Sequence, residues 1–452
     1  PLLKAVKDGE IEESLVDEKV RNILRMMLRL KMIGPERKHR KTGAYNTEEH
    51  RRAVLDVARE SMILLKNEDQ VLPLQAESGC KVAVIGANAA AIHSNGGGSA
   101  EIKALYEISP LMGIKKLLGG NVKVSYAPGY VIPDKKEASE INWQAASTET
   151  AEDTEKESTV SGRALDEKQQ EALAEAVALA KASDIVIFVG GLNHDFDVEG
   201  LDRVNMKLPY GQDEVIDALL KAVPDTVVCM YAGAPVEMPW AEKAKAILWS
   251  YYAGMEGGTA LAEILSGKVN PSGKLAETFI RDASQCPAHT IGTFGKKDRV
   301  EYREGVMVGY RYYDTKKTDV LFPFGHGFSY TSFTYDDLEI IKQQENGRQT
   351  VKVSCSVTNT GKRAGKETIQ IYVAPEQKKD RPVHELKAFE KVRLDAGETK
   401  RICVILEERD FSRYDTDKKM PVPVNGTYEI QVGASSTDIC LCGKIDLFFA
   451  EG

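Results

Sequence analysis

Apolar residues in the first part of the chain fall into short runs that alternate with amphipathic segments. The runs predict buried strands over residues 82–86, 122–126, 184–190, 226–231 and 246–252. Apolar positions at helical spacing predict helices between them, over residues 110–118, 166–182, 212–222 and 257–266. This alternation predicts a mostly parallel sheet with helices on both faces, which is a three-layer α/β/α sandwich.

Two more amphipathic helices are predicted ahead of the first strand, over residues 14–34 and 47–66. The residues that would cap them are Ser14 with Asp17 and Asn46 with Glu49. Gly34-Pro35 would end the first helix. No strand follows that helix directly, so it needs a surface on which to pack.

The pattern changes after about Ser332, where helical periodicity gives way to strict alternation of apolar and polar residues. Alternating segments cover residues 351–357, 367–373, 400–406 and 427–432, and turn signals occur at Asn359-Thr360-Gly361 and Asn425-Gly426. Short strands at this spacing predict a β-sandwich of immunoglobulin or fibronectin type. Between the predicted helices, residues 145–162 are rich in Ser, Thr, Glu and Asp and predict a surface insertion, with a lid as the alternative.

Composition narrows the functional classes. The 452 residues carry a formal net charge of −8, which argues against nucleic acid and against an anionic membrane surface as partners. No apolar run approaches the ~20 residues needed to span a bilayer. The seven cysteines are scattered, so reduced thiols in a cytoplasmic protein are the simplest interpretation. The sequence begins with Pro1, so its start does not report the compartment, and homo-oligomerisation stays open.

The candidate chemistry concentrates in the acidic run from Asp195 to Arg203, which follows the apolar run 184–191. Ligands bind at the carboxyl ends of strands in open α/β sheets. Carboxylates this close together cannot all ionise normally, so we expect at least one to hold its proton, as a general acid requires. The alternative is a solvated acidic surface loop.

Other candidates surround this run. A glycine-rich segment runs from Asn95 to Ser99, as Asn95-Gly96-Gly97-Gly98-Ser99. It matches no phosphate-binding fingerprint, which weakens a nucleotide-binding interpretation. The glycines predict either a loop that lines a hydroxyl-rich ligand pocket or a tight turn. His194 adjoins the acidic run, and Glu304 lies in an aromatic segment that lines either a pocket or a domain joint. For residues 322–330, a joint between domains is the favoured interpretation. The histidines are not at metal-ligand spacing, so no metal or cofactor is predicted.

Several motifs occur together in a specific order along nearly the whole chain. They are residues 59–67 with Leu72-Pro73-Leu74, Gly96–Ser99, Glu199-Gly200-Leu201-Asp202-Arg203, 254–258 with 270–275, Tyr302–Tyr313, 322–331, 357–361 and 385–389. In this order the chain resembles glycoside hydrolase family 3, the β-glucosidase and β-xylosidase group.

The resemblance implies a retaining glycosidase without a cofactor that acts on a β-glucoside or a related oligosaccharide. It implies that Glu199 is the general acid/base and that Asp202 and Arg203 support it, the guanidinium through bidentate bonds to carboxylates. Residues that would line the substrate pocket are Gly97, Gly98, Ser99, His194 and Glu304. The family's aspartate nucleophile lies on an N-terminal (β/α)8 barrel.

The chain departs from the family in one large respect, because neither the barrel nor a Ser-Asp-Trp-like nucleophile motif occurs in the 452 residues. Residues 1–45 would then be the end of a barrel plus a linker, 46–331 the α/β sandwich domain, and 332–452 a fibronectin type III-like β-sandwich. The barrel would come from the same precursor or from a separate chain. A non-catalytic carbohydrate-binding or assembly module is the alternative, and the choice between glucose, xylose and other sugars stays open.

Overall fold

The structure is a computed structural model that describes residues 2–39, 43–132, 167–200, 202–295, 299–345, 348–376 and 381–449. The predicted insertion at residues 145–162 lies outside the described residues. The chain divides into two compact units, Pro1–His50 and Arg51–Gly452.

The first unit holds α1 (Leu2–Lys7) and α2 (Glu13–Arg29), and no residue of either helix is buried. The prediction of one helix over residues 14–34 is therefore wrong at its end. The backbone leaves the helix near Lys31, whose φ is 55°. The predicted cap at Ser14 is also wrong, since the residue that caps α2 is Glu12, without a side-chain hydrogen bond.

The predicted helix over residues 47–66 is a helix followed by a strand, α3 (Glu48–Ser61) and β1 (Ile63–Asn67). Met62 to Leu65 are all fully buried, and β1 pairs antiparallel with β6. Four consecutive buried apolar residues fit a strand covered on both faces better than one helical stripe. Asn46 takes φ 54°, and at the start of α3 the Oγ1 of Thr47 accepts from the N–H of His50.

The first sheet has six strands in the order β1-β6-β5-β4-β2-β3, and all neighbours except β1 and β6 run parallel. The remaining strands are β2 (Lys81–Ile85), β3 (Lys123–Ala127), β4 (Ile185–Gly191), β5 (Val227–Tyr231) and β6 (Ala246–Trp249). All five lie at the positions predicted from the sequence, within three residues at each end. The predicted mostly parallel sheet is confirmed.

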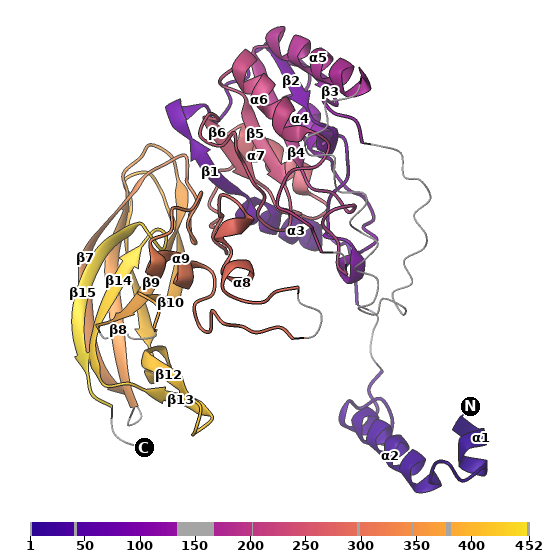
Figure 1. Cartoon of the computed structure of the whole chain (residues 1–452), viewed down its shortest axis with the longest axis vertical. Coiled ribbons are helices and arrows are strands. Elements are labelled where there is room, and N and C mark those ends of the chain that lie inside the picture. The colour runs from indigo at the N-terminus through magenta and orange to yellow at the C-terminus, as the bar shows by residue number, and fades with distance from the viewer. Residues whose placement is uncertain are drawn as a thin grey trace. The chain divides into compact units, whose positions relative to one another are not determined.

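Helices cover both faces of this sheet (Figure 1). One face packs against α5 (Glu167–Lys181) and α6 (Gln212–Ala222), and the other against α4 (Pro110–Leu118) and α7 (Gly257–Leu265). The shorter helices are α8 (Pro287–Thr290), α9 (Tyr310–Lys316) and the 3-10 turns η1 (Glu68–Gln70), η2 (Ala87–Ala89), η3 (Gly98–Ala100) and η5 (Ala283–Gln285). We call α3 to α9, with the sheet, the α/β domain.

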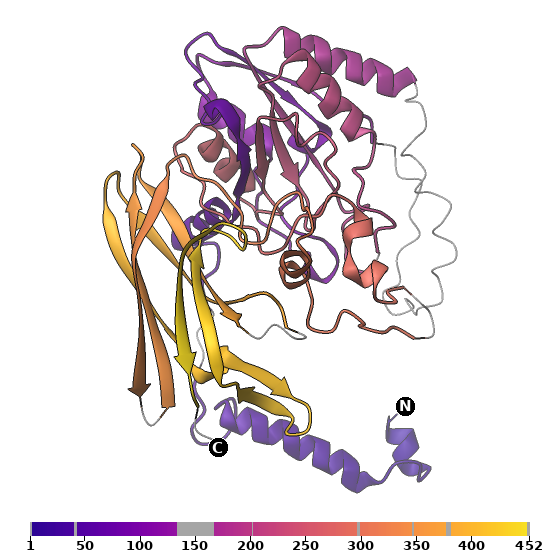
Figure 2. The same cartoon turned by 60° about the vertical axis from the view of Figure 1, so that its left-hand side comes forward.

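The C-terminal part of the second unit, here called the C-terminal sandwich, is all β and is coloured orange to yellow in Figure 1. Its two sheets have the orders β10-β9-β14-β15 and β11-β8-β7 and enclose one apolar core (Figure 2). Its elements are β7 (Phe333–Glu345), β8 (Arg348–Asn359), β9 (Gly365–Pro375), β10 (Glu385–Leu394), β11 (Thr399–Leu406), η6 (Glu408–Phe411), β12 (Ser412–Asp415), β13 (Met420–Pro423), β14 (Gly426–Gly433) and β15 (Ile439–Leu447). The predicted β-sandwich is confirmed.

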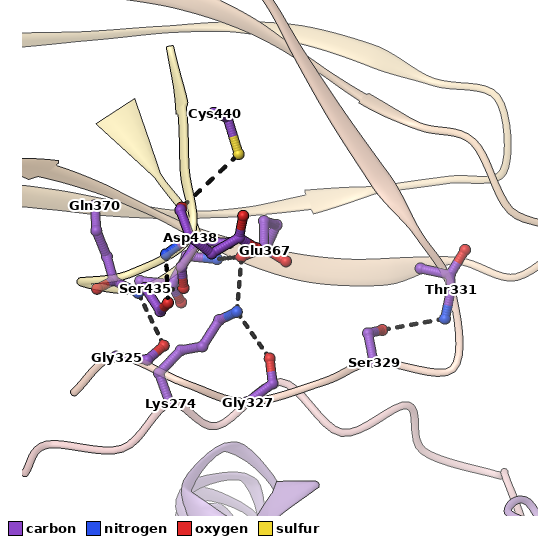
Figure 3. A network of polar contacts seen from close by, with 12 residues as sticks. Lys274, Gly325, Gly327, Ser329, Thr331, Glu367, Gln370, Ser435, Asp438 and Cys440 are labelled. Atoms are coloured by element: carbon purple, nitrogen blue, oxygen red, sulfur yellow. Dashed lines mark hydrogen bonds and ion pairs between the residues drawn. The ribbon is translucent and has the colours of Figure 1, made fainter. Parts of the chain in front are cut away.

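A buried polar network joins the α/β domain to the C-terminal sandwich (Figure 3). Lys274 forms an ion pair with Glu367 on β9 at 3.0 Å and donates to the carbonyl oxygen of Gly327 at 2.9 Å. The Nε2 of Gln370 donates to the carbonyl oxygen of Gly325 at 3.0 Å. Because Gly325 and Gly327 belong to residues 322–330, the predicted domain joint is confirmed.

A cavity of about 370 Å³ lies beside this joint, between α3 and the strands β9 and β10. Its charged side chains already pair with one another: Glu60 accepts from Lys366 and Lys391, and Arg59 bonds to Glu263. The cavity is far in the fold from the acidic run, and its ion pairs account for its charge. We assign no chemistry to it.

Candidate active site

The order of the strands determines where a ligand can approach the sheet. From β2 the chain goes first to β3 on one side and then to β4 on the other side, so the connections diverge between β2 and β4. In open α/β sheets such a switch point leaves a crevice outside the carboxyl ends of the two strands. The glycine-rich loop follows β2, and the acidic run follows β4.

These two loops touch each other at the switch point. The backbone N–H of Ser99 donates to Oε2 of Glu199 at 2.7 Å. A Cβ on Gly98 would lie 2.6 Å from the Cβ of Glu199, and one on Gly97 would lie 3.2 Å from Val198. The glycines therefore allow a contact that larger residues would prevent, as the pocket-lining interpretation of this loop requires.

Buried amides fix the start of the acidic loop. Gln212 is fully buried, and its side chain exchanges two hydrogen bonds of 2.8 Å with the backbone N–H and carbonyl of Gly191. Asn88, also buried, donates from Nδ2 to the carbonyl oxygen of Leu192 at 3.1 Å. The loop thus leaves β4 in one defined direction.

Two of the aspartates in the acidic run, Asp195 and Asp197, are bonded to other parts of the α/β domain. The hydroxyl of Tyr210 donates to Oδ2 of Asp195 at 3.2 Å. Oδ2 of Asp197 accepts from the N–H of Gly233 at 2.6 Å and from the hydroxyl of Tyr252 at 2.8 Å. Asp195 and Glu199 are both exposed, and Asp197 is half-buried. Of these three carboxylates, Glu199 is the one that bonds to the glycine-rich loop across the switch point.

The expectation that crowding helps a carboxylate of this loop to hold its proton is wrong for Glu199. The backbone N–H and hydroxyl of Ser99 both donate to this carboxylate and hold its pKa below the ordinary value. The bonds of Asp195 and Asp197 run to Tyr210, Gly233 and Tyr252 instead. A raised pKa at Glu199 therefore needs a group from outside this loop.

His194 lies in the contact between the two loops. Its Nε2 is 2.7 Å from the carbonyl oxygen of Asn95, so this nitrogen carries the proton and donates. Its ring packs edge-on against Tyr252, with the centroids 6.3 Å apart. Nearby, burial and the charge of His194 lower the pKa of His93 to about 4, so His93 stays neutral. His194 thus links the two loops, and its role in a substrate pocket stays a prediction.

Arg203 does not form the expected bidentate pair with a carboxylate. Its Nη2 donates to the carbonyl oxygen of Pro235 at 3.1 Å, and its buried Nη1 has no hydrogen-bond partner among the described residues. Its charge favours ionisation of Tyr252 and Glu277. Asp202 is exposed. The guanidinium therefore contributes a positive charge to this site but not the predicted fork geometry.

Glu304 stands apart from these loops. Its buried Oε2 has no hydrogen-bond partner among the described residues, and a Cβ on Gly292 would lie 3.1 Å from it. Among the described residues no hydrogen bond or ion pair joins it to the acidic loop. Its role in a pocket stays a prediction.

The sequence analysis did not identify Tyr252 and Glu277 near the site, and it did not separate Asp197 from the other carboxylates of the acidic run. Tyr252 ends the apolar run 246–252, and the rule used for the acidic loop applies equally to the carboxyl end of this strand. Asp197 belonged to the acidic run, but no sequence signal separates its role from that of Glu199. Burial raises the pKa of Glu277, which the charge of Arg203 partly opposes. Glu277 follows no motif that would have indicated it.

Neither a metal centre nor a membrane span emerges from the described residues. No group of three or more His, Cys, Asp or Glu among them could hold a metal ion. No helix in this part of the chain is both long and apolar enough to pass through a bilayer. The chemistry that the site offers is proton transfer by an exposed carboxylate.

The chain is similar to proteins of known class over nearly its whole length. It is 38% identical to thermostable β-glucosidase B of Acetivibrio thermocellus and to a β-glucosidase of Bacteroides ovatus, each over 97% of this chain. A crystal structure of a glycoside hydrolase family 3 β-glucosidase of Bifidobacterium adolescentis superimposes with a TM-score of 0.79 and 33% identity, over 99% of this chain and 60% of that one. The chain spans 53% and 56% of the two curated relatives.

Two family descriptions match separate parts of the chain. The glycosyl hydrolase family 3 C-terminal domain matches residues 62–330, and the fibronectin type III-like domain matches residues 367–436. The first covers most of the α/β domain, including both loops of the switch point, and the second lies within the C-terminal sandwich. The chain therefore belongs to glycosyl hydrolase family 3, as that family's C-terminal domain followed by a fibronectin type III-like domain.

Proposed function

We propose that this chain supplies the general acid/base, Glu199, of a retaining β-glucosidase. The aspartate nucleophile comes from a (β/α)8 barrel domain, in the same precursor or on a separate chain. The enzyme removes terminal non-reducing β-D-glucosyl residues. One observation carries the proposal: Glu199 is exposed at the switch point, where its carboxylate meets the glycine-rich loop through the N–H of Ser99. The β-glucosidase names of the relatives support the substrate class.

Glu199 acts twice in this mechanism. It protonates the leaving oxygen in the first step and removes a proton from water in the second. In a retaining enzyme the two carboxyl groups lie about 5–5.5 Å apart. At that distance an ionised nucleophile raises the pKa of Glu199 by like-charge repulsion, and it opposes the bond from Ser99 that lowers this pKa.

The opposition between the repulsion from the nucleophile and the bond from Ser99 also suits the second step. Once the nucleophile carries the glucosyl group it is neutral, so the repulsion disappears and the pKa of Glu199 falls again. The N–H of Ser99 then stabilises the carboxylate that must take a proton from water. A low pKa of Glu199 is thus expected in this chain by itself, where the carboxylate of the nucleophile does not face it.

The test is Glu199→Ala in the complete enzyme, barrel included. We expect kcat/KM to fall on the order of 10²–10⁴-fold for phenyl β-glucoside, whose leaving group needs a proton. The loss for 2,4-dinitrophenyl β-glucoside should be far smaller, and azide should restore turnover. The control is Glu101→Ala, which removes an exposed glutamate from the facing loop and should change neither rate.

Equal losses on both substrates without azide rescue would contradict the assignment of Glu199. Binding of glucosides by the complete protein without any hydrolysis would support the alternative, a non-catalytic carbohydrate-binding module.

A further inference from the structure

We propose that Asp197 is a positioning residue for Glu199, because its carboxylate connects the acidic loop to the loops that follow β5 and β6. This inference rests on the proposed function of Glu199. It adds a second residue whose removal should change the protonation step in particular.

The geometry of Asp197 is unusual in one respect: two donors from different loops converge on one oxygen. The N–H of Gly233 follows β5, the hydroxyl of Tyr252 follows β6, and both donate to Oδ2, at 2.6 and 2.8 Å. A charged acceptor makes short, strong hydrogen bonds of this kind. Burial and the negative charge of Asp197 raise the pKa of Tyr252, so its hydroxyl stays a donor.

The position of Asp197 in the loop gives it influence over Glu199. Only Val198 separates the two residues. On one side, Ser99 of the β2 loop holds the carboxylate of Glu199. On the other side, Asp197 holds the backbone two residues earlier against the β5 and β6 loops. The acidic loop with Glu199 is therefore held between the β2 loop on one side and the β5 and β6 loops on the other.

Removal of Asp197 leaves the contacts on the β2 side in place. Without Asp197 the loop remains bonded to Ser99 and to Asn95, both on the β2 side. The carboxylate of Glu199 is then free to leave the position that the two sets of contacts define together, in which it would face a substrate. A displacement of about 1 Å in a catalytic group costs on the order of 10²-fold in rate.

The test uses the complete enzyme and the two glucosides named above. We expect Asp197→Ala to lower kcat/KM on the order of 10²-fold for phenyl β-glucoside and only a few-fold for the dinitrophenyl substrate. Asp197→Asn keeps an oxygen that can accept both donors and should recover most of this loss. Tyr252→Phe removes one of the two bonds and should cost roughly tenfold on the phenyl substrate.

The matched control is Asp184→Ala. Oδ2 of Asp184 accepts from the backbone N–H of Lys81 at 2.8 Å, at the opposite, amino ends of β4 and β2. Asp184→Ala removes a comparable bond at the other end of β4, away from the acidic loop. We expect it to lower stability without changing the ratio of rates on the two substrates.

The outcomes separate this inference from the proposed function. A uniform loss for Asp197→Ala on both substrates, or no loss at all, would overturn the positioning role while Glu199→Ala still showed selective loss and azide rescue. If Glu199→Ala itself lost activity uniformly, the proposed function would fail. Thermal denaturation of each variant, compared with Asp184→Ala, shows whether a rate change follows from unfolding.

Discussion

Two regions of this molecule hold a glutamate against a neighbouring segment, and they treat it in opposite ways. At the domain joint, the side chain of Glu367 is 7% exposed and pairs with Lys274, which is itself 13% exposed (Figure 3). At the switch point, Glu199 is exposed and accepts from the N–H of Ser99. The first carboxylate is enclosed with its counter-ion, and the second faces solvent.

The difference indicates that Glu367 serves stability, whereas Glu199 is available for proton transfer. A buried carboxylate with a cation beside it is costly to disturb, because either partner alone is a buried charge. An exposed carboxylate held by hydrogen bonds contributes little to stability but can exchange a proton with a ligand. If this distinction is right, substitutions in the two regions should differ in what they damage.

The largest expected effect on stability is at the joint. Lys274→Met leaves Glu367 buried without its cation and should lower the free energy of unfolding by about 3–5 kcal/mol. Urea unfolding followed by circular dichroism measures this loss. The double variant Lys274→Met/Glu367→Leu removes both charges and should recover much of it. If the double variant lost as much as the sum of the two single variants, the pair would not be coupled as described.

A smaller effect is expected at Asp213, a carboxylate near the carboxyl edge of the sheet that forms no ion pair among the described residues. Burial raises its pKa from 3.8 to about 7, although the indole N–H of Trp240 donates to it at 2.9 Å. Between pH 4 and 7 the folded chain therefore keeps a proton that the unfolded chain has lost. This stabilisation is complete below pH 4 and disappears as the pH rises through about 7.

Asp213→Asn should remove this pH dependence. The variant should equal the parent chain at pH 4 and exceed it by on the order of 3 kcal/mol at pH 8, measured by urea unfolding. Asp217 on the same helix is the control, because Lys221 and Lys243 lower its pKa. Asp217→Asn should slightly destabilise the chain at pH 8. A gain from Asp217→Asn as well would show that the effect is general to the helix.

The next effect tests the contact between the two loops. Gly98→Ala places a Cβ 2.6 Å from the Cβ of Glu199, at a residue whose φ is 61°. Gly120→Ala is its control, with φ 85° and no atom within 4 Å of the added Cβ. We expect a loss of about 1 kcal/mol for the control and about 2 kcal/mol for Gly98→Ala in thermal denaturation. Equal losses would mean that the loop moves freely away from Glu199.

The smallest effect is expected at Glu199 itself. Glu199→Gln should change the melting temperature very little, because exposed substitutions usually stay within about 0.5 kcal/mol. A large destabilisation would place Glu199 in the same class as Glu367 and remove the distinction between the two regions.

Much of the fold could be predicted from the sequence, because the strands of the first sheet are continuous apolar runs and several strands of the sandwich alternate. The errors have physical causes. Ile63 to Leu65 fit both a helical stripe and a buried strand, and only pairing with β6 decides between them. In β10, residues 385–393 are at most half-buried, and a register shift between Leu386 and Ala388 interrupts the pairing with β9.

The site was less accessible to sequence reasoning. The position of Glu199 at a strand end could be predicted, but the pKa direction could not. That direction depends on where each carboxylate of the loop points, and Asp197 points to Gly233 and Tyr252 while Glu199 points to Ser99. Such orientations are set by contacts between residues more than thirty positions apart, which local sequence patterns do not encode.

The joint in Figure 3 also bears on how such proteins are assembled by recombination. Gly325 accepts from the amide of Gln370 with so little room that a Cβ there would lie 2.1 Å from Oε1 of that amide. Lys274 has its counter-ion across the same boundary. An exchange that replaced the C-terminal sandwich by an unrelated one would leave a buried cation unmatched and a tight backbone contact unfilled. The two modules should therefore be inherited together, and a successful crossover should fall elsewhere in the gene.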